Sequence, residues 1–204
     1  MIWKELINWR CNILKVVAFN GSPRKEGNTA TLIKYVFEEL EKEGIETDLV
    51  HIGGKKTIGC TACMKCYQNK DMRCIFNDDL VNECIVKMID ADGIILASPT
   101  YFTDITTGMK ALIDRAGFVS KANGELFKRK VGAAVVAVRR AGSLHAFTTM
   151  NNFFSINQMI IPGSMYWNIG VGGAPGDVEK DEEGIHTMRT LGQNMAWLMK
   201  KLYS

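Results

Sequence analysis

The stretch NGSPRKEGNT, residues 20–29, joins an apolar run to an amphipathic segment. Before it, residues 13–19 (ILKVVAF) are nearly all apolar and rich in β-branched residues, which is typical of a parallel strand buried on both faces. After it, Thr29 and a series of apolar residues fall at helical spacing on one stripe, namely Leu32, Ile33, Val36, Phe37 and Leu40. The stretch is therefore predicted to be a strand-to-helix loop.

A loop of this kind is suited to binding phosphate. It directs several backbone N–H groups and the positive end of a helix dipole toward one point, and Arg24 and Lys25 add positive charge. The loop contains neither a Gly-x-Gly-x-x-Gly pattern nor the Lys-Ser/Thr pair of a nucleotide triphosphate loop. An ordinary strand-to-helix turn capped by Asn28 is the alternative interpretation.

Four further segments have strand character, and they alternate with segments of helical periodicity. The strand segments are 45–52, 93–98, 131–138 and 165–171, and helical stripes run over 78–89, 109–116 and 188–202. This alternation predicts an α/β fold, a flavodoxin-like doubly wound five-stranded parallel sheet. The second and fifth strands are the least apolar and belong at the edges, which gives the order 2-1-3-4-5. Ligands of such sheets bind beyond the carboxyl ends of the strands.

Size and composition predict one globular domain over residues 1–204, with a short helical extension at 1–11. The net charge of +3 is small and scattered, which argues against nucleic acid as a partner. No apolar stretch reaches the length of a membrane span, and the N-terminus lacks the apolar region of a signal peptide. A cytoplasmic protein without membrane contact is expected.

The cysteine pattern points to a metal or redox site. Cys60, Cys63, Cys66 and Cys74 lie in a connection at 53–77 that has no apolar periodicity and far exceeds the usual two to six residues. Four thiolates match a cubane iron-sulfur cluster or a tetrahedral zinc ion. The consecutive Cys-x-x-Cys spacing favours the cluster, with zinc and free or redox-active thiols as alternatives. Cys11 and Cys84 stand apart and are expected to be packed thiols.

The residues after the third strand form a second candidate contact surface. Tyr101 and Phe102 offer flat apolar surface, and free backbone polar groups surround Pro99 and Thr100. This combination suits a planar heterocycle, while a plain hydrophobic turn is the alternative. Three other expectations concern Lys110 with Asp114 as a surface pair, His51 as a surface residue of the edge strand, and the aromatic stretch 147–167 as mostly core.

These motifs resemble the flavodoxin-like FMN reductases, and within them the iron-sulfur flavoproteins. The resemblance rests on GSPRxxGNT at 21–29, SPTYF at 98–102 and the cysteine segment. It implies FMN, with the phosphate held by Ser22, Arg24, Asn28 and Thr29 and the ring contacted by Pro99, Thr100, Tyr101 and Phe102. Arg139 and Gly142 are expected to close over the other side of the flavin because of their position after the fourth strand. It implies a 4Fe-4S cluster on Cys60, Cys63, Cys66 and Cys74. It also implies a homodimer or homotetramer.

The expected function is that of a flavin-dependent oxidoreductase. It would pass electrons from reduced ferredoxin or NAD(P)H to a small-molecule or protein acceptor. No catalytic side chain is expected, because a flavin brings its own chemistry and the three histidines are scattered. One alternative is an NAD(P)H:FMN or quinone reductase whose cysteines are free or bind zinc. Another is a non-enzymatic module that binds a phosphate ligand.

Overall fold

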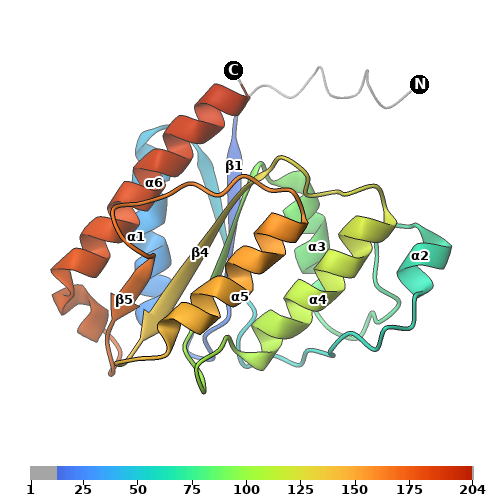
Figure 1. The fold of residues 1–204 in the computed structure, drawn as a ribbon, viewed down its shortest axis with the longest axis horizontal. Helices are drawn as coiled ribbons and strands as arrows, with labels where there is room; N and C mark the ends of the chain where they lie inside the picture. The colour runs from blue at the N-terminus through green and yellow to red at the C-terminus, as the bar shows by residue number, and fades with distance from the viewer. Residues whose placement is uncertain (1–12, 204) are drawn as a thin grey trace.

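The structure is a computed structural model that describes residues 13–203 (Figure 1). This part of the chain contains a five-stranded parallel sheet of order β2-β1-β3-β4-β5, so the predicted order is confirmed. The strands are β1 (Lys15–Asn20), β2 (Glu46–His51), β3 (Gly93–Pro99), β4 (Val131–Val138) and β5 (Ile169–Val171). The predicted helix at 1–11 lies outside the described residues, and so does Cys11.

Helices cover both faces of the sheet (Figure 1). One face carries α1 (Asn28–Lys42) and α6 (Glu182–Leu202), and the other carries α3 (Val81–Asp90), α4 (Thr107–Ala122) and α5 (Ser143–Ile156). The connections contain the short helices α2 (Lys65–Asn69) and η2 (Asp177–Lys180). Among the described helices, none combines the length and the apolar character needed to cross a membrane.

The central strands divide their side chains between two apolar cores. In β1, Val17 and Phe19 join the core beneath α3, α4 and α5, while Val16 and Ala18 join the core beneath α1 and α6. All eight residues of β4 are buried. Because successive side chains of a strand point to opposite faces, a strand covered on both faces must be apolar throughout. This requirement explains the continuous apolar runs of the sequence.

The two edge strands differ from the central ones. β2 has no fully buried residue, as its polar sequence predicted. β5 has only three residues, whereas seven were predicted. The backbone turns before it, since Ile169 N–H donates to Trp167 O at 2.6 Å. The Asn168 side chain then donates to Ala134 O at 3.0 Å, in the place of a further strand residue.

The stretch 147–167 differs most from expectation. Its first half forms most of α5, which the sequence did not reveal because Thr148, Thr149 and the neighbouring asparagines are weak helix formers. Phe153, Phe154 and Met159 are buried as expected. Tyr166 and Trp167 are 57% and 47% exposed, so the prediction that they belong to the core is wrong.

Candidate functional site

The loops that follow the strands meet at the carboxyl edge of the sheet. A Cβ atom at Gly53 would lie 2.1 Å from Ser22 O, so the loops after β1 and β2 are in contact. Gly142 has φ +85°, and a Cβ there would lie 3.0 Å from Thr103 Cγ2, so the loops after β3 and β4 are in contact too. The loops thus form one continuous rim.

The first helix begins at this rim without a side-chain cap. Its N-cap residue is Gly27, which makes no capping bond, and its first turn contains no acidic residue. The alternative interpretation of a turn capped by Asn28 is therefore wrong, because Asn28 is already the first helical residue. The N–H groups of a helix's first turn have no partner within the helix. This uncapped end can accept an anion.

The loop ahead of α1 is held in shape by its own side chains. Ser22 N–H donates to Asn20 Oδ1 at 2.9 Å, and Ser22 Oγ accepts a hydrogen bond from Arg24 N–H at 3.2 Å. Ser22 and Thr29 are buried, whereas Arg24 is exposed. The two hydroxyl residues are therefore packed within the loop, and the Arg24 side chain is exposed to solvent.

Asn28 connects this loop to the loop after β5. Its Nδ2 donates to Ala174 O at 2.9 Å, and its Oδ1 accepts from Gly176 N–H at 2.9 Å. Since the amide carries two N–H donors and one is used for Ala174 O, the side chain keeps a second N–H that could bind a ligand.

His51 has a role that the sequence did not reveal. It is only partly exposed, and its Nε2 lies 2.8 Å from Ser22 O. A carbonyl oxygen accepts hydrogen bonds only, so the imidazole donates and ties the end of β2 to the loop after β1. The prediction of a simple surface residue is corrected. The signal available in the sequence was its position at the carboxyl end of a strand beside β1.

The loop after β3 holds a buried hydroxyl and exposed aromatic rings. Thr100 N–H donates to Ala137 O at 2.9 Å, while its buried Oγ1 has no hydrogen-bond partner within residues 13–203. Tyr101 is half exposed and Phe102 is fully exposed, with φ +46°. A cavity of about 540 Å³ lies beside the two rings. The two rings line this cavity together with residues of the loops after β1 and β2, whereas Thr100 is not among the lining residues.

Arg139 and Gly142 lie in the loop after β4. Arg139 is exposed, and a Cβ at Gly173 would lie 3.5 Å from Arg139 Cγ, so this side chain runs beside the loop after β5. Gly142 is the N-cap residue of α5. Both residues therefore lie on the rim, beside the loops after β3 and β5.

The four cysteines of the long connection line one small cavity of about 20 Å³. Cys63 is exposed and the other three are partly exposed. Ala62 N–H donates to Cys60 Sγ at 3.5 Å, and the backbone has positive φ at Ala62 and Met64. Four sulfur donors are the ligand set that a cysteine-bound metal centre uses. In residues 13–203, however, no three His, Cys, Asp or Glu side chains are grouped closely enough to hold a metal ion.

Cys84 is a packed thiol, as predicted. It is buried in the core beneath α3, α4 and α5, and burial raises the pKa of its thiol to about 12. Burial also raises the pKa of Cys66.

The predicted surface pair on α4 is confirmed as well, because Lys110 Nζ lies 2.6 Å from the exposed Asp114 carboxylate.

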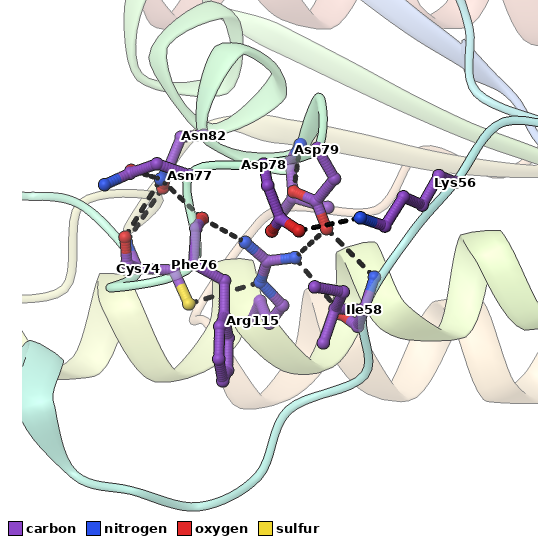
Figure 2. Close-up of polar contacts among 10 residues, drawn as sticks. Lys56, Ile58, Cys74, Phe76, Asn77, Asp78, Asp79, Asn82 and Arg115 are labelled. Atoms are coloured by element: carbon purple, nitrogen blue, oxygen red, sulfur yellow. Dashed lines mark hydrogen bonds and ion pairs between the residues drawn. The ribbon is translucent and has the colours of Figure 1, made fainter.

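Figure 2 shows a buried ion pair beneath the cysteine segment that the sequence did not reveal. The Arg115 guanidinium on α4 pairs with Asp79, and both side chains are fully buried. Burial opposes the charged form of Asp79, but hydrogen bonds from Arg115, Ile58 N–H and Val81 N–H hold the pKa of its carboxyl below the usual value. These bonds also explain why α3 begins at Val81, after the predicted start at Asp78 or Asp79.

Known structures with similar folds define the class of protein. A flavodoxin, WrbA-like protein from Agrobacterium tumefaciens superimposes with a TM-score of 0.64 at 14% identity, over 94% of this chain and 99% of that one. RosB, whose structure holds 8-demethyl-8-formylriboflavin-5'-phosphate, gives a TM-score of 0.69 at 19% identity, over 93% of this chain and 80% of its own. The fold is flavodoxin-like.

The sequence relatives define the family. The family model described as NADPH-dependent FMN reductase matches residues 14–174. An iron-sulfur flavoprotein of Methanocaldococcus jannaschii is 38% identical over 92% of this chain and 98% of its own length. The iron-sulfur flavoprotein of Methanosarcina thermophila is 34% identical over 86% of this chain and 90% of its own. The chain belongs to the NADPH-dependent FMN reductase family and is a flavin-dependent oxidoreductase.

Proposed function

We propose that this chain is an iron-sulfur flavoprotein, with FMN on the rim of the sheet and a 4Fe-4S cluster on Cys60, Cys63, Cys66 and Cys74. The observation that carries the proposal is the shared cavity of these four cysteines in a chain whose rim fits a flavin. Relatives of nearly the same length that are named iron-sulfur flavoproteins support it. The consecutive spacing of the first three cysteines is closer to a ferredoxin than to a zinc ribbon.

The rim divides the binding of FMN between three loops. The backbone N–H groups at the start of α1 bind the phosphate together with Ser22, Asn28 and Thr29, and Arg24 closes over it. The ring lies against Pro99, Tyr101 and Phe102, and Thr100 Oγ1 gives its unused hydrogen bond to a ring atom. Arg139 and Gly142 cover the opposite side from the loop after β4.

The chain's own task is to hold and orient this flavin. Bound FMN supplies the redox chemistry, because a flavin can exchange electrons in pairs or singly. The His51 bond to Ser22 O and the Asn28 bonds to the loop after β5 fix the phosphate loop from both sides. Exposed Tyr101 and Phe102 leave one approach to the ring open to a donor.

The electron donor in this proposal is reduced ferredoxin or NAD(P)H, and the acceptor is a small molecule or a protein. The chain acts as a homodimer or homotetramer, which would cover the exposed Tyr166 and Trp167. Its location in the cytoplasm stays a prediction from the sequence.

A second candidate is an NAD(P)H:FMN or quinone reductase without a cluster. It is favoured by one observation, namely that no three potential ligands in the described residues are grouped closely enough for a metal ion. In that case the cysteines are free thiols or bind zinc. Membership of a reductase family argues against the third possibility, a non-enzymatic phosphate-binding module.

A pair of cysteine variants tests the proposal. Cys63→Ala removes a proposed cluster ligand, and Cys84→Ala is the matched control because Cys84 is buried away from the cavity. Both proteins are purified without oxygen and their visible spectra are recorded. Cys63→Ala is expected to lose the broad brown absorbance of the cluster and to keep the flavin bands. Cys84→Ala is expected to keep both.

Two results would contradict this arrangement. Loss of FMN together with the brown absorbance in Cys63→Ala would show that the two sites are not separate. An unmodified protein that is yellow and free of iron would support the reductase without a cluster.

A further inference from the structure

Arg115 is the largest of the fully buried side chains, and it lies beneath the cysteine segment (Figure 2). A buried arginine is stable only when its charge is paired and its N–H groups are hydrogen-bonded. Asp79 provides the paired charge. The other contacts of the guanidinium all go to the connection that carries the cysteines, between β2 and α3.

These contacts reach both halves of the connection. Nη1 donates to Ile58 O at 3.1 Å, just before the first cysteine, and Nη2 donates to Phe76 O at 2.8 Å, just after the last. Nε donates to Cys74 Sγ at 3.2 Å. The guanidinium thus holds the two ends of the cysteine segment together and directs one N–H group at a sulfur atom.

Cys74 is fixed from its other side as well. Cys74 N–H donates to Asn82 Oδ1 at 2.8 Å, and Asn82 Nδ2 donates to Cys74 O at 2.9 Å. Asn82 is itself buried on α3. The backbone of Cys74 is therefore set by α3 and its sulfur by α4, whereas Cys63 is exposed and Cys60 Sγ has only a bond from a neighbouring N–H group.

We propose that Arg115 is the positioning residue of the cysteine site, which orients Cys74 Sγ as a ligand and stabilises the negative charge on it. The proposal rests on the proposed function, in which this sulfur binds a cluster. Hydrogen bonds to sulfur and nearby positive charge raise the reduction potential of an iron-sulfur cluster. Arg115 supplies both the hydrogen bond and the positive charge. The Asp79 carboxylate partly offsets that positive charge.

A purely structural role for Arg115 makes a different prediction. If the guanidinium served only to anchor the connection, removing either member of the ion pair would loosen it in the same way. A role in tuning the cluster requires that the two removals shift its reduction potential in opposite directions. Loss of the Nε–H bond removes stabilisation of the sulfur charge, whereas loss of the Asp79 anion leaves the Arg115 charge less compensated.

The test compares Arg115→Lys with Asp79→Asn in the full chain, purified without oxygen. Lysine keeps the positive charge but lacks the fork that reaches Asp79, Phe76 O and Cys74 Sγ together. Redox titration followed by visible absorbance is expected to give a more negative midpoint potential for the cluster in Arg115→Lys and a more positive one in Asp79→Asn. Arg189→Lys is the matched control, since it alters an ion pair on the opposite face of the sheet.

Hydrogen exchange of the metal-free protein provides a second measurement. The Cys74 amide is expected to exchange about tenfold faster in Arg115→Lys, as loss of about 1.4 kcal/mol of local protection would cause, and to be unchanged in Arg189→Lys. Unchanged potentials, or shifts in the same direction for both variants, would overturn the proposal. If Arg115→Lys does not fold, an unshifted potential in Asp79→Asn would overturn it alone.

A different result would contradict the proposed function itself. An unmodified protein that contains no iron or sulfide would contradict the cluster. The exchange rates of the Cys74 amide would still show whether Arg115 fixes this residue.

Discussion

A single hydroxyl supports the proposed position of the flavin ring. Thr100 Oγ1 is buried and has no hydrogen-bond partner in the described part of the chain. A buried polar atom without a partner costs about 1–3 kcal/mol of stability. Such an atom at the carboxyl end of β3 is explained if a bound ring supplies the partner.

The substitution Thr100→Val replaces this hydroxyl with a methyl group of similar size. We expect FMN to bind about five- to tenfold more weakly, as loss of one hydrogen bond of about 1 kcal/mol predicts. The metal-free and flavin-free protein should be as stable as before or more stable, because the orphan hydroxyl is gone. Quenching of flavin fluorescence measures the affinity and thermal unfolding measures the stability.

Thr149→Val on α5 is the control for this pair of measurements, since Thr149 lies away from the rim. Equal FMN affinity in Thr100→Val and the unmodified protein would place the ring elsewhere.

At the scale of elements, the packing of α1 against α6 depends on one buried carboxylate. Glu39 on α1 accepts hydrogen bonds from Arg189 at 2.9 Å and from Gln193 at 3.0 Å, both on α6. A further bond comes from Lys42 at 2.6 Å. Hydrogen bonds from Lys42 and Gln193, opposed by burial, lower the pKa of Glu39 to about 2.

Glu39→Gln should therefore lower stability at neutral pH, by about 1 kcal/mol. The folded pKa lies below the ordinary value of 4.5, so this stabilisation is present above about pH 4.5 and is lost as the pH falls toward 2. Urea unfolding at pH 7 and at pH 3 measures it, and the difference between variant and unmodified protein should shrink at pH 3.

The exposed pair of Glu43 with Lys200 provides the control, because such pairs contribute little. A Glu39→Gln effect that is no larger than that of Glu43→Gln would contradict the account of this helix pair.

The elements that the sequence predicted well are those whose pattern depends on burial alone. Residues 131–138 form β4 as predicted, because a strand buried on both faces must be apolar throughout. β5 was predicted too long because the side-chain hydrogen bond of Asn168 decides the backbone before it, and α5 was missed because its residues are weak helix formers. Sequence periodicity carries no signal for such bonds.

The candidate site, like the fold, was predictable only where its residues form a local sequence pattern. The loops and the four cysteines are local patterns, so they could be read directly from the sequence. Arg115 could not be assigned a role, since its partner Asp79 is 36 residues away in the sequence. Arg115 lies on α4, whereas Asp79 lies in the connection before α3. An arginine on an apolar helix stripe and a carboxylate just before the preceding helix were the available signals.

At the scale of the whole molecule, the rim and the cysteine cavity lie at different places on the fold. The rim loops lie at the carboxyl edge, while the cysteine cavity lies against α4, with Arg115 and Phe118 in its lining. The connection 53–77 spans both, because Gly53 contacts the loop after β1 and Cys74 contacts α4. The same connection therefore contacts both the proposed flavin site and the proposed cluster site.

The central claim is that one chain holds both a flavin and an iron-sulfur cluster. It is tested most directly by measuring FMN, iron and acid-labile sulfide in the same sample of protein purified without oxygen. The account predicts about one FMN, four iron and four sulfide per chain, as one FMN and one 4Fe-4S cluster require. One FMN per chain with no iron or sulfide, or with zinc in their place, would contradict it.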